Sequence, residues 1–240
     1  EILIKVKACA VCGTDLRIFR GQKKIDVQIT GHEISGIIEE IGKGVEGYFV
    51  GDKVVPETVV GCGLCDACKK GEENRCQRKY KAIGYQFNGG YAQFLLIPQL
   101  AVKQGNVIKI PKSLSFEEAS IIEPLSCVIN GWYPFKLRPQ GFTVAIIGAG
   151  IIGMLHTEYA KQKGAKVILI NRSSPRLVLA QKIGLAVDSY IDSSICSPVD
   201  KVKELTDGLG ADVVICAASS REIQREALEM AAIDADVSFF

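Results

Sequence analysis

The hydrophobic positions of the chain follow two different patterns, and the change falls near residue 142. Beyond it, short runs of consecutive apolar residues alternate with longer mixed segments that begin with serine or glycine. Strands that are buried on both faces of a parallel sheet are apolar throughout. The runs therefore predict strands at residues 143–147, 166–170, 187–191, 212–216 and 236–240. This alternation is typical of a doubly wound α/β domain with a parallel sheet.

Serine residues mark the starts of several predicted helices. Ser174 and Ser197 each stand before a proline, a pair typical of an N-cap and a first helical turn. Ser219 stands three residues before Glu222, as in a capping box. Together with the glycine-rich turn after residue 147, these signals predict helices at residues 150–163, 174–184, from 197 onward and from 219 to about 232.

The first 112 residues are β-rich, and glycines interrupt the strand-like segments. These segments predict strands at residues 2–6, 34–41, 53–56, 91–97 and 107–110. A capping box from Ser115 to Glu118 predicts a helix from about residue 116 towards residue 130. A junction with two prolines and a glycine follows at residues 134–141. We therefore predict two domains, at residues 1–133 and 134–240.

Composition and charge exclude several classes of protein. The chain has 240 residues, of which 48% are hydrophobic and 23% charged, as in globular domains. Its 29 Lys and Arg residues nearly balance 27 Asp and Glu residues, so we expect no nucleic-acid or membrane partner. No apolar run reaches the roughly 18–20 residues that a bilayer span needs. The chain starts inside a strand-like run without a signal peptide, so we expect a cytoplasmic protein with segments missing at both ends.

Four of the nine cysteines lie close together and predict a metal site. Four thiolates form a closed tetrahedral zinc site that stabilises a loop, and the candidates are Cys62, Cys65, Cys68 and Cys76. An iron–sulfur cluster is one alternative. In the bacterial ferredoxin motif three residues separate the last two cysteines and a proline follows, whereas here the gap before Cys76 is longer and Gln77 follows it. Unliganded thiols are the other alternative, and we favour zinc because exposed clustered thiols oxidise readily. We interpret four further cysteines as small buried hydrophobic residues: Cys9, Cys127, Cys196 and Cys216.

A glycine-rich turn lies between the predicted strand 143–147 and the helix that follows it. It has the dinucleotide-binding fingerprint in the expected strand–helix context, with the residues Gly148, Ala149, Gly150, Ile151, Ile152 and Gly153. Gly148 permits the tight turn, Gly150 lets the backbone approach a pyrophosphate, and Gly153 lets the helix pack against the strand. Amides at the helix N-terminus bind the anion. A turn without ligand is the alternative, and we assign His156 no catalytic role.

A second group of metal-ligating residue types is spread over the first 123 residues. Cys12 precedes Thr14, His32 precedes Glu33, and Glu123 lies in the helix predicted after the capping box. One cysteine, one histidine and a carboxylate make an open, three-ligand zinc site of the catalytic type. The spacing alone leaves this assignment open.

Four motifs occur in one order along the chain: Cys-Gly-Thr-Asp at 12–15, Gly-His-Glu at 31–33, the four-cysteine loop and Gly-Ala-Gly-x-x-Gly at 148–153. Because these motifs occur in this order, the sequence resembles the zinc-dependent medium-chain dehydrogenase/reductase family. Val-Gly-Asp-Lys-Val-Val at 50–55 and Gly-Gly-Tyr-Ala at 89–92 are also similar to family signatures. The resemblance covers nearly the whole chain. It implies a GroES-like catalytic domain, a Rossmann domain, a cofactor in the cleft between them, and a C-terminal segment that this chain lacks.

The segment Glu-Pro-Leu-Ser-Cys-Val at 123–128 is similar to the sorbitol (polyol) and threonine dehydrogenase branch of that family. The resemblance implies a catalytic zinc held by Cys12, His32 and either Glu33 or Glu123, with one carboxylate reaching the ion through water. Ligation by both His32 and Glu33 needs a bend in the backbone, because neighbours on a straight strand point to opposite faces.

The resemblance also implies a reaction, the reversible oxidation of a secondary alcohol on a polyol or sugar-like substrate. Zinc lowers the pKa of the substrate hydroxyl, Thr14 passes the proton outward, and the nicotinamide accepts the hydride. Many relatives end this proton relay on a histidine where this chain has Arg17. Because arginine cannot accept a proton, water or a cofactor ribose ends the relay here. We expect a homodimer or homotetramer.

Two other functions fit parts of the sequence. A threonine-type amino-alcohol dehydrogenase shares the same motifs. A zinc-ribbon nucleic-acid-binding module would use the basic residues around the cysteine loop, but Asp66, Glu72 and Glu73 offset their charge.

The end of the second predicted α/β strand favours NADP over NAD. An NAD enzyme usually has an acid there to bind the ribose 2′-hydroxyl. This chain has Asn171, Arg172 and Ser173 instead, so no acid repels a 2′-phosphate and the guanidinium offers a fork of donors. NAD bound by Asn171, with Arg172 solvated, is the alternative.

Overall fold

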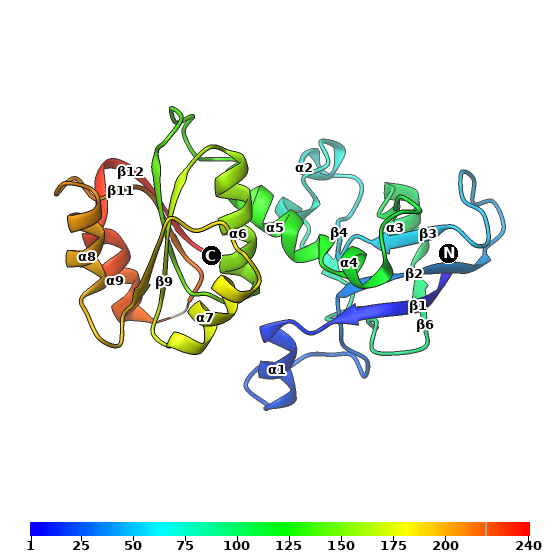
Figure 1. Cartoon of the computed structure of the whole chain (residues 1–240). Helices are drawn as coiled ribbons and strands as arrows, with labels where there is room; N and C mark the ends of the chain where they lie inside the picture. Colours follow the sequence, from blue (N-terminus) through cyan, green and yellow to red (C-terminus); the bar gives the residue numbers. More distant parts are fainter. Residues whose placement is uncertain (219) are drawn as a thin grey trace. The chain divides into compact units, whose positions relative to one another are not determined.

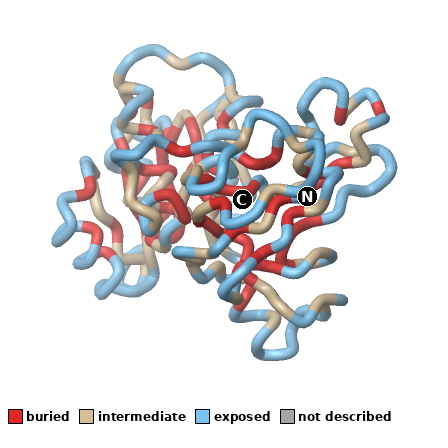
Figure 2. The backbone as a smooth tube through the Cα atoms, turned by 90° about the vertical axis from the view of Figure 1, so that its right-hand side faces the viewer, coloured by how far each residue is buried: buried red, intermediate tan, exposed pale blue. Residues whose placement is uncertain are grey.

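The computed structural model describes residues 1–218 and 220–240. The chain forms two units, Glu1–Pro124 and Leu125–Phe240, and each has its own hydrophobic core. Figure 2 shows the buried residues along the inner segments of the backbone and the exposed residues along the outer ones. In the part of the chain that is described, no helix is long and apolar enough to cross a membrane. A domain boundary after residue 133 stays a prediction.

The Glu1–Pro124 unit is built on an antiparallel sheet with the strand order β6-β1-β2-β3-β7. These strands are β1 (Ile2–Ala10), β2 (Glu33–Ile41), β3 (Lys53–Pro56), β6 (Phe94–Ile97) and β7 (Val107–Lys109). Alternate residues of β1 and β2 face one core, and Ile2, Ile4, Ile34 and Ile38 are at most 2% exposed. A smaller sheet pairs β4 (Val59–Val60) with β5 (Lys81–Ala82). The helices are α1 (Gly13–Phe19), α2 (Asp66–Lys69), η1 (Glu73–Arg75), α3 (Gln99–Gln104) and α4 (Phe116–Ser120).

The Leu125–Phe240 unit is a parallel sheet between two layers of helices (Figure 1). The strand order is β10-β9-β8-β11-β12, and every pair is parallel. The strands are β8 (Thr143–Ile147), β9 (Lys166–Asn171), β10 (Ser189–Asp192), β11 (Ala211–Cys216) and β12 (Ala231–Phe239). The helices are α5 (Ile122–Trp132), which starts in the first unit, α6 (Ile151–Gln162), α7 (Ser174–Lys182), α8 (Pro198–Leu205) and α9 (Arg221–Glu229).

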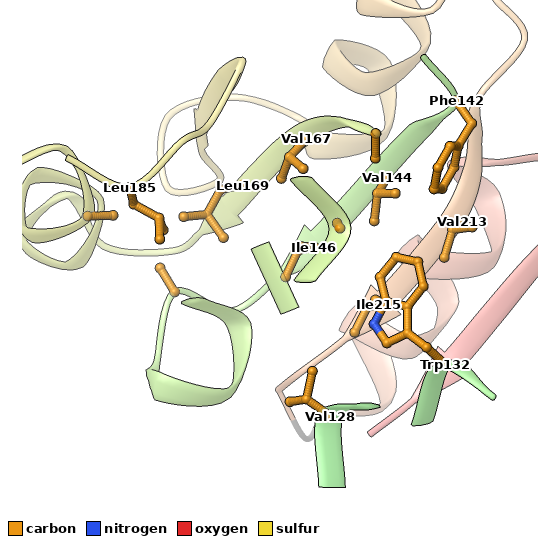
Figure 3. Packing of buried hydrophobic residues seen from close by; sticks show 14 of the residues in the cluster. Val128, Trp132, Phe142, Val144, Ile146, Val167, Leu169, Leu185, Val213 and Ile215 are labelled. Carbon is orange, nitrogen blue, oxygen red and sulfur yellow. The ribbon is translucent and has the colours of Figure 1, made fainter. Parts of the chain in front are cut away.

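Alternate residues of the central strands face opposite helical layers. Val144 and Ile146 of β8 pack with residues of α5, α6 and α7 (Figure 3). Ala145 and Ile147 pack with residues of α8 and α9 on the other face. Burial on both faces explains the uninterrupted apolar runs in the sequence. The predicted doubly wound parallel sheet is therefore confirmed.

The helix predicted after the Ser115 capping box is in fact two helices. The box itself is present, because the Ser115 hydroxyl accepts from the Glu118 amide at 3.1 Å and the Glu118 carboxylate accepts from the Ser115 amide at 2.8 Å. However, α4 ends at Ser120 and α5 begins at Ile122. Pro124 explains the break, since it has no amide to donate to the Ser120 carbonyl.

The N-cap of α7 lies one residue before the predicted cap. It is Ser173, and Ser174 is the first helical residue. Asn171 holds Ser173 outside the helix, because its Nδ2 donates to the carbonyl and hydroxyl oxygens of Ser173 at 2.9 and 3.2 Å. The predicted cap Ser197 of α8 is confirmed, since its hydroxyl accepts from the Asp200 amide at 3.3 Å.

The last helix also differs from its prediction. The predicted cap Ser219 lies outside the described residues. Ser220 is the N-cap of α9, and its hydroxyl accepts from the Ile223 amide at 3.2 Å. The helix ends at Glu229 and not near residue 232, because the chain from Ala231 onward pairs with β11. Strand pairing therefore overrides the local helix signal.

Two of the four cysteines that we interpreted as buried are exposed. Cys216 is buried in β11 and Cys9 is partly buried. Cys127 on α5 and Cys196 in the turn before α8 are exposed. The prediction was wrong for these two because apolar neighbours in sequence do not determine which side of a helix or turn a residue occupies.

Candidate active site and metal centres

The four cysteines between β4 and β5 converge, and their sulfur atoms all lie within 4.8 Å of one another. Cys62 and Cys68 have their Sγ atoms 3.9 Å apart, as do Cys65 and Cys76, and Cys65 and Cys68 are 3.4 Å apart. Four sulfurs at the usual Zn–S distance of about 2.3 Å define a tetrahedron with edges of about 3.8 Å. The loop therefore fits a closed zinc site.

Backbone amides around this loop favour thiolates. Cys62 Sγ accepts from the amides of Leu64 and Cys65, each at 3.4 Å. The amides of Cys68 and Gln77 lower the pKa of Cys65 to about 6. The loop thus offers a thiolate at neutral pH, which is the form that binds zinc.

Cys12, His32 and Glu33 form a second cluster, and their ligand atoms lie within 4.8 Å of one another. Cys12 is the N-cap of α1, and Glu33 is the first residue of β2. Gly31, immediately before His32, has a φ of +93°. This left-handed residue turns the chain immediately before His32, at the start of β2. One thiol, one imidazole and one carboxylate are a suitable donor set for an open zinc site.

The turn at Gly31 is covered by the Gly-Gly-Tyr-Ala segment at 89–92. The amides of residues 89–91 donate to the carbonyls of residues 29–31 at 2.8 to 3.0 Å. A Cβ atom on Gly89 would lie 2.2 Å from the Gly31 carbonyl oxygen, and one on Gly31 would lie 2.8 Å from Cys9 Sγ. Side chains are excluded at both positions, so the backbone of one segment holds the other in place.

The cluster of Cys12, His32 and Glu33 places several acidic groups close together where little solvent reaches them. Burial raises the pKa values of the Cys12 thiol and the Glu33 carboxyl, and the charge of Asp15 raises both further. Asp15 Oδ1 and His32 Nδ1 are buried, lie 3.7 Å apart and have no hydrogen-bond partner among the described residues. A divalent cation would offset this accumulation of negative charge. The residues present therefore fit a metal ion.

Asp15 connects the cluster to Tyr91. Its Oδ2 accepts from the Cys12 amide and from the Tyr91 hydroxyl, both at 2.9 Å, while Oδ1 faces His32 Nδ1. A carboxylate beside a ligating imidazole fixes the orientation of the ring. Because Nδ1 faces Asp15, Nε2 is the ring nitrogen of His32 that would bind a metal ion. Sequence analysis did not find the Tyr91 contact, because 76 residues separate it from Asp15.

Tyr85 is a further residue that sequence analysis did not find. Its hydroxyl oxygen lies 3.4 Å from His32 Nε2. Burial raises the pKa of Tyr85, the nearby Cys12 raises it further, and a hydrogen bond with the Thr14 side chain lowers it. Tyr85 and Thr14 therefore lie together beside the metal-ligating residues.

Of the two carboxylates considered as a third ligand, the structure brings Glu33 into the converging group of described residues. Glu123 lies in the first turn of α5 and is not a member of that group. Its charge nevertheless contributes to the raised pKa of Tyr85. Arg17, at the position expected to end the proton relay, lies in the last turn of α1.

The glycine fingerprint forms the turn from β8 to α6. Gly148 has a φ of +111°, and a Cβ atom there would lie 2.9 Å from the Ala217 carbonyl oxygen. A Cβ atom on Gly153 would lie 1.8 Å from the Gly148 carbonyl oxygen. Gly150 is the N-cap of α6, and among the residues that the structure describes a Cβ atom there would meet only Arg176 Nη1, at 3.7 Å. Gly148 therefore suits a tight turn, Gly150 leaves room for a ligand to approach the backbone, and Gly153 allows close packing of the helix.

The end of β9 lies beside this turn. Asn171 Oδ1 accepts from the Ala149 amide at 3.1 Å, so the second strand of the α/β unit holds the glycine turn in place. Ile151 and Ile152 form the start of α6, where the free amides of a helix N-terminus bind anions.

Arginines lie on both sides of the start of α7. Arg172 and Ser173 are exposed immediately after β9. Arg176, in the first turn of α7, directs its guanidinium group towards Gly150. Sequence analysis did not consider Arg176, although the helix start at Ser174 placed it one turn from Arg172.

Comparison with known proteins identifies the family. Residues 1–112 match the alcohol dehydrogenase GroES-like domain, and residues 152–240 match the zinc-binding dehydrogenase family. A zinc-binding dehydrogenase from Sinorhizobium meliloti 1021, solved bound to NADP, has a TM-score of 0.88 and 30% identity over 98% of this chain and 68% of that chain. The chain belongs to the zinc-binding alcohol dehydrogenase family. The predicted resemblance, and with it the GroES-like and Rossmann-type architecture, is confirmed.

Curated relatives of this zinc-binding alcohol dehydrogenase family member act on different substrates. Sorbitol dehydrogenase of Halalkalibacterium halodurans is 34% identical over 217 residues, which are 90% of this chain and 61% of the relative. L-Threonine 3-dehydrogenase of Pyrococcus horikoshii is 38% identical over 221 residues, again 90% of this chain and 61% of the relative. The chain therefore spans 61% of the length of these curated relatives.

Proposed function

We propose that the chain forms the catalytic and cofactor-binding part of a zinc-dependent dehydrogenase that oxidises a secondary alcohol of a polyol. The convergence of Cys12, His32 and Glu33 carries this proposal. The glycine turn of the α/β unit supports a dinucleotide cofactor, and similarity to a sorbitol dehydrogenase supports the polyol class.

Each residue of the cluster has a role in this proposal. Cys12, His32 and Glu33 hold the ion, which supplies a Lewis acid for the substrate hydroxyl when bound. The Thr14 hydroxyl accepts the substrate proton through a hydrogen bond and passes it outward. Arg17 has no acceptor atom, so water or the cofactor ribose receives the proton.

A second zinc ion is proposed for the cysteine loop. Cys62, Cys65, Cys68 and Cys76 form a closed set with no open position, so an ion there stabilises the loop and takes no part in the reaction. Glu123 remains the alternative ligand for the catalytic ion, through water.

We infer that NADP is preferred over NAD. β9 ends in Asn171 where an acid would favour NAD. Arg172 and Arg176 are exposed around the start of α7, and guanidinium forks match the geometry of a 2′-phosphate. The similar structure from Sinorhizobium meliloti contains NADP, which supports this preference. The nicotinamide supplies the redox chemistry.

An amino-alcohol dehydrogenase is the second candidate. Its support is the 38% identity to an L-threonine 3-dehydrogenase, against 34% for the sorbitol dehydrogenase. Relative turnover of L-threonine and sorbitol separates the two functions. The expected homodimer or homotetramer stays a prediction, which light scattering would check.

Turnover by the zinc-loaded chain with NAD and NADP tests the proposal. We expect oxidation of sorbitol, and we expect Cys12→Ser to lower kcat/KM at least about 100-fold, because even residues behind the ligands contribute 10- to 100-fold. Cys196→Ser, an exposed cysteine outside both clusters, is the matched control and should leave kcat/KM unchanged. Activity that survives Cys12→Ser would contradict the proposed site, and oxidation of L-threonine alone would favour the second candidate.

A further inference from the structure

Lys23, Tyr85 and His32 form a stack at the edge of the metal-ligating cluster. The Lys23 ammonium lies 4.5 Å from the centre of the Tyr85 ring. The Tyr85 and His32 ring centres are 5.1 Å apart, and the Tyr85 hydroxyl oxygen is 3.4 Å from His32 Nε2. The stack therefore connects the candidate catalytic centre to a positive charge.

The charge of Lys23 is not neutralised by a carboxylate. Lys23 is exposed, and within residues 1–218 and 220–240 it forms no ion pair. The cation–π contact holds its flexible side chain over the Tyr85 ring without removing the charge. Arg20 and Lys24 are also exposed on this segment, where Asp26 is the one exposed carboxylate among residues 20–26, so the local charge is positive and favours an anion.

The field of Lys23 reaches the cluster itself. The ammonium and the His32 ring centre lie 4.5 and 5.1 Å from the Tyr85 ring centre, so they are at most about 10 Å apart, a distance comparable to the Debye length of about 8 Å at physiological salt. A substrate held at the cluster therefore lies within the field of Lys23.

We propose that Lys23 binds the phosphate group of a phosphorylated polyol whose reacting hydroxyl lies at the cluster of Cys12, His32 and Glu33. This assignment rests on the proposed dehydrogenase function and specifies its substrate class. Lys23 is exposed whereas His32 is 5% exposed, so an anion at the ammonium lies outside the buried cluster, several bonds from the reacting carbon.

The separation favours a phosphate ester over a short hydroxy acid or amino acid. A carbon–carbon bond spans about 1.5 Å, so a carboxylate two bonds from the reacting carbon remains beside the cluster. The terminal phosphate of a five- or six-carbon polyol extends past the width of the ring. Its second negative charge also strengthens the pairing with Lys23.

Oxidation of sorbitol and sorbitol 6-phosphate by the zinc-loaded chain tests this assignment. A charge-assisted hydrogen bond of about 1.5–3 kcal/mol corresponds to at least tenfold in affinity. We therefore expect Lys23→Gln to lower kcat/KM for sorbitol 6-phosphate about tenfold, through KM, and to change the value for sorbitol less than twofold. The neighbouring Lys24→Gln should change neither value, and Lys23→Arg should retain the preference.

The outcomes separate this assignment from the proposed function. If both substrates are oxidised and Lys23→Gln leaves their ratio unchanged, Lys23 does not bind the substrate, and the dehydrogenase function stands. If neither substrate is oxidised, the proposed function is wrong, and calorimetric titration with sorbitol 6-phosphate decides the role of Lys23. About tenfold weaker binding to Lys23→Gln would support an anion site, and equal binding would exclude it.

Discussion

Mildly acidic pH should destabilise the Leu125–Phe240 unit through one buried histidine. His156 is 1% exposed, and its Nδ1 accepts from Trp132 Nε1 at 2.8 Å. Its ring meets Phe240 edge to face, with the ring centres 4.7 Å apart. The imidazolium form has no acceptor atom, so protonation would break the hydrogen bond with Trp132 and place a charge among aromatic rings.

The size of this effect follows from the pKa of His156, which burial lowers from 6.5 to about 4. The unfolded chain therefore binds a proton at a pH where the folded chain does not. The stabilising contribution is complete above pH 6.5, falls as the pH drops, and is lost below pH 4. At 1.36 kcal/mol for each pKa unit, we expect a loss of about 2 kcal/mol between pH 7.5 and pH 5.

Urea unfolding followed by tryptophan fluorescence measures this loss directly, because the chain contains one tryptophan, Trp132. His156→Gln is the matched variant, since glutamine offers an acceptor to Trp132 but does not titrate. Its free energy of unfolding should lack the loss of about 2 kcal/mol over the same range. The pKa values of Asp188 and Asp192 are held below 3.8, so neither aspartate titrates in the folded unit between pH 7.5 and 5. Equal losses in the wild type and His156→Gln would refute the role of His156.

Three further predictions concern the metal and cofactor sites. Cys65→Ser should remove one of two zinc ions and lower the midpoint of thermal unfolding, whereas Cys12→Ser should abolish turnover and lower that midpoint less. Zinc content and thermal unfolding are measured for both variants, and an equal decrease in the midpoint would contradict the division of roles. Gly153→Ala, whose Cβ would lie 1.8 Å from the Gly148 carbonyl oxygen, should destabilise the chain by about 1–3 kcal/mol in urea unfolding, and a neutral result would show that the turn relaxes. Arg176→Glu should lower the kcat/KM ratio of NADP to NAD about tenfold, and an unchanged ratio would exclude contact with the 2′-phosphate.

The α/β unit was the more predictable part of the chain because its signals are local. The strand predicted at 143–147 matches β8 residue for residue, since its apolar run is bounded by polar and glycine residues. The Ser197 cap and the Ser115 capping box are also local hydrogen bonds. The errors occurred where a distant pairing decided the outcome, as at Ala231, which joins β11.

The candidate active site was less predictable, because its residues meet across long stretches of chain. The sequence motifs indicated Cys12 and His32, but no periodicity places Tyr85 beside His32, 53 residues away. The cation–π contact that positions Lys23 likewise depends on how the loops of the β-rich unit fold together. Such contacts arise from tertiary packing and have no local sequence signal.

The glycines explain why the family could nevertheless be inferred from sequence. Gly89 belongs to a segment that we noted only as a family signature, yet its missing side chain lets the backbone approach the Gly31 carbonyl at the turn before His32. Gly153 likewise allows α6 to approach the Gly148 carbonyl. A side chain at either position meets backbone atoms, and rotation about its own bonds cannot relieve that conflict. The glycines that carry the resemblance therefore also fix the two turns on which the proposed metal ligand and cofactor depend.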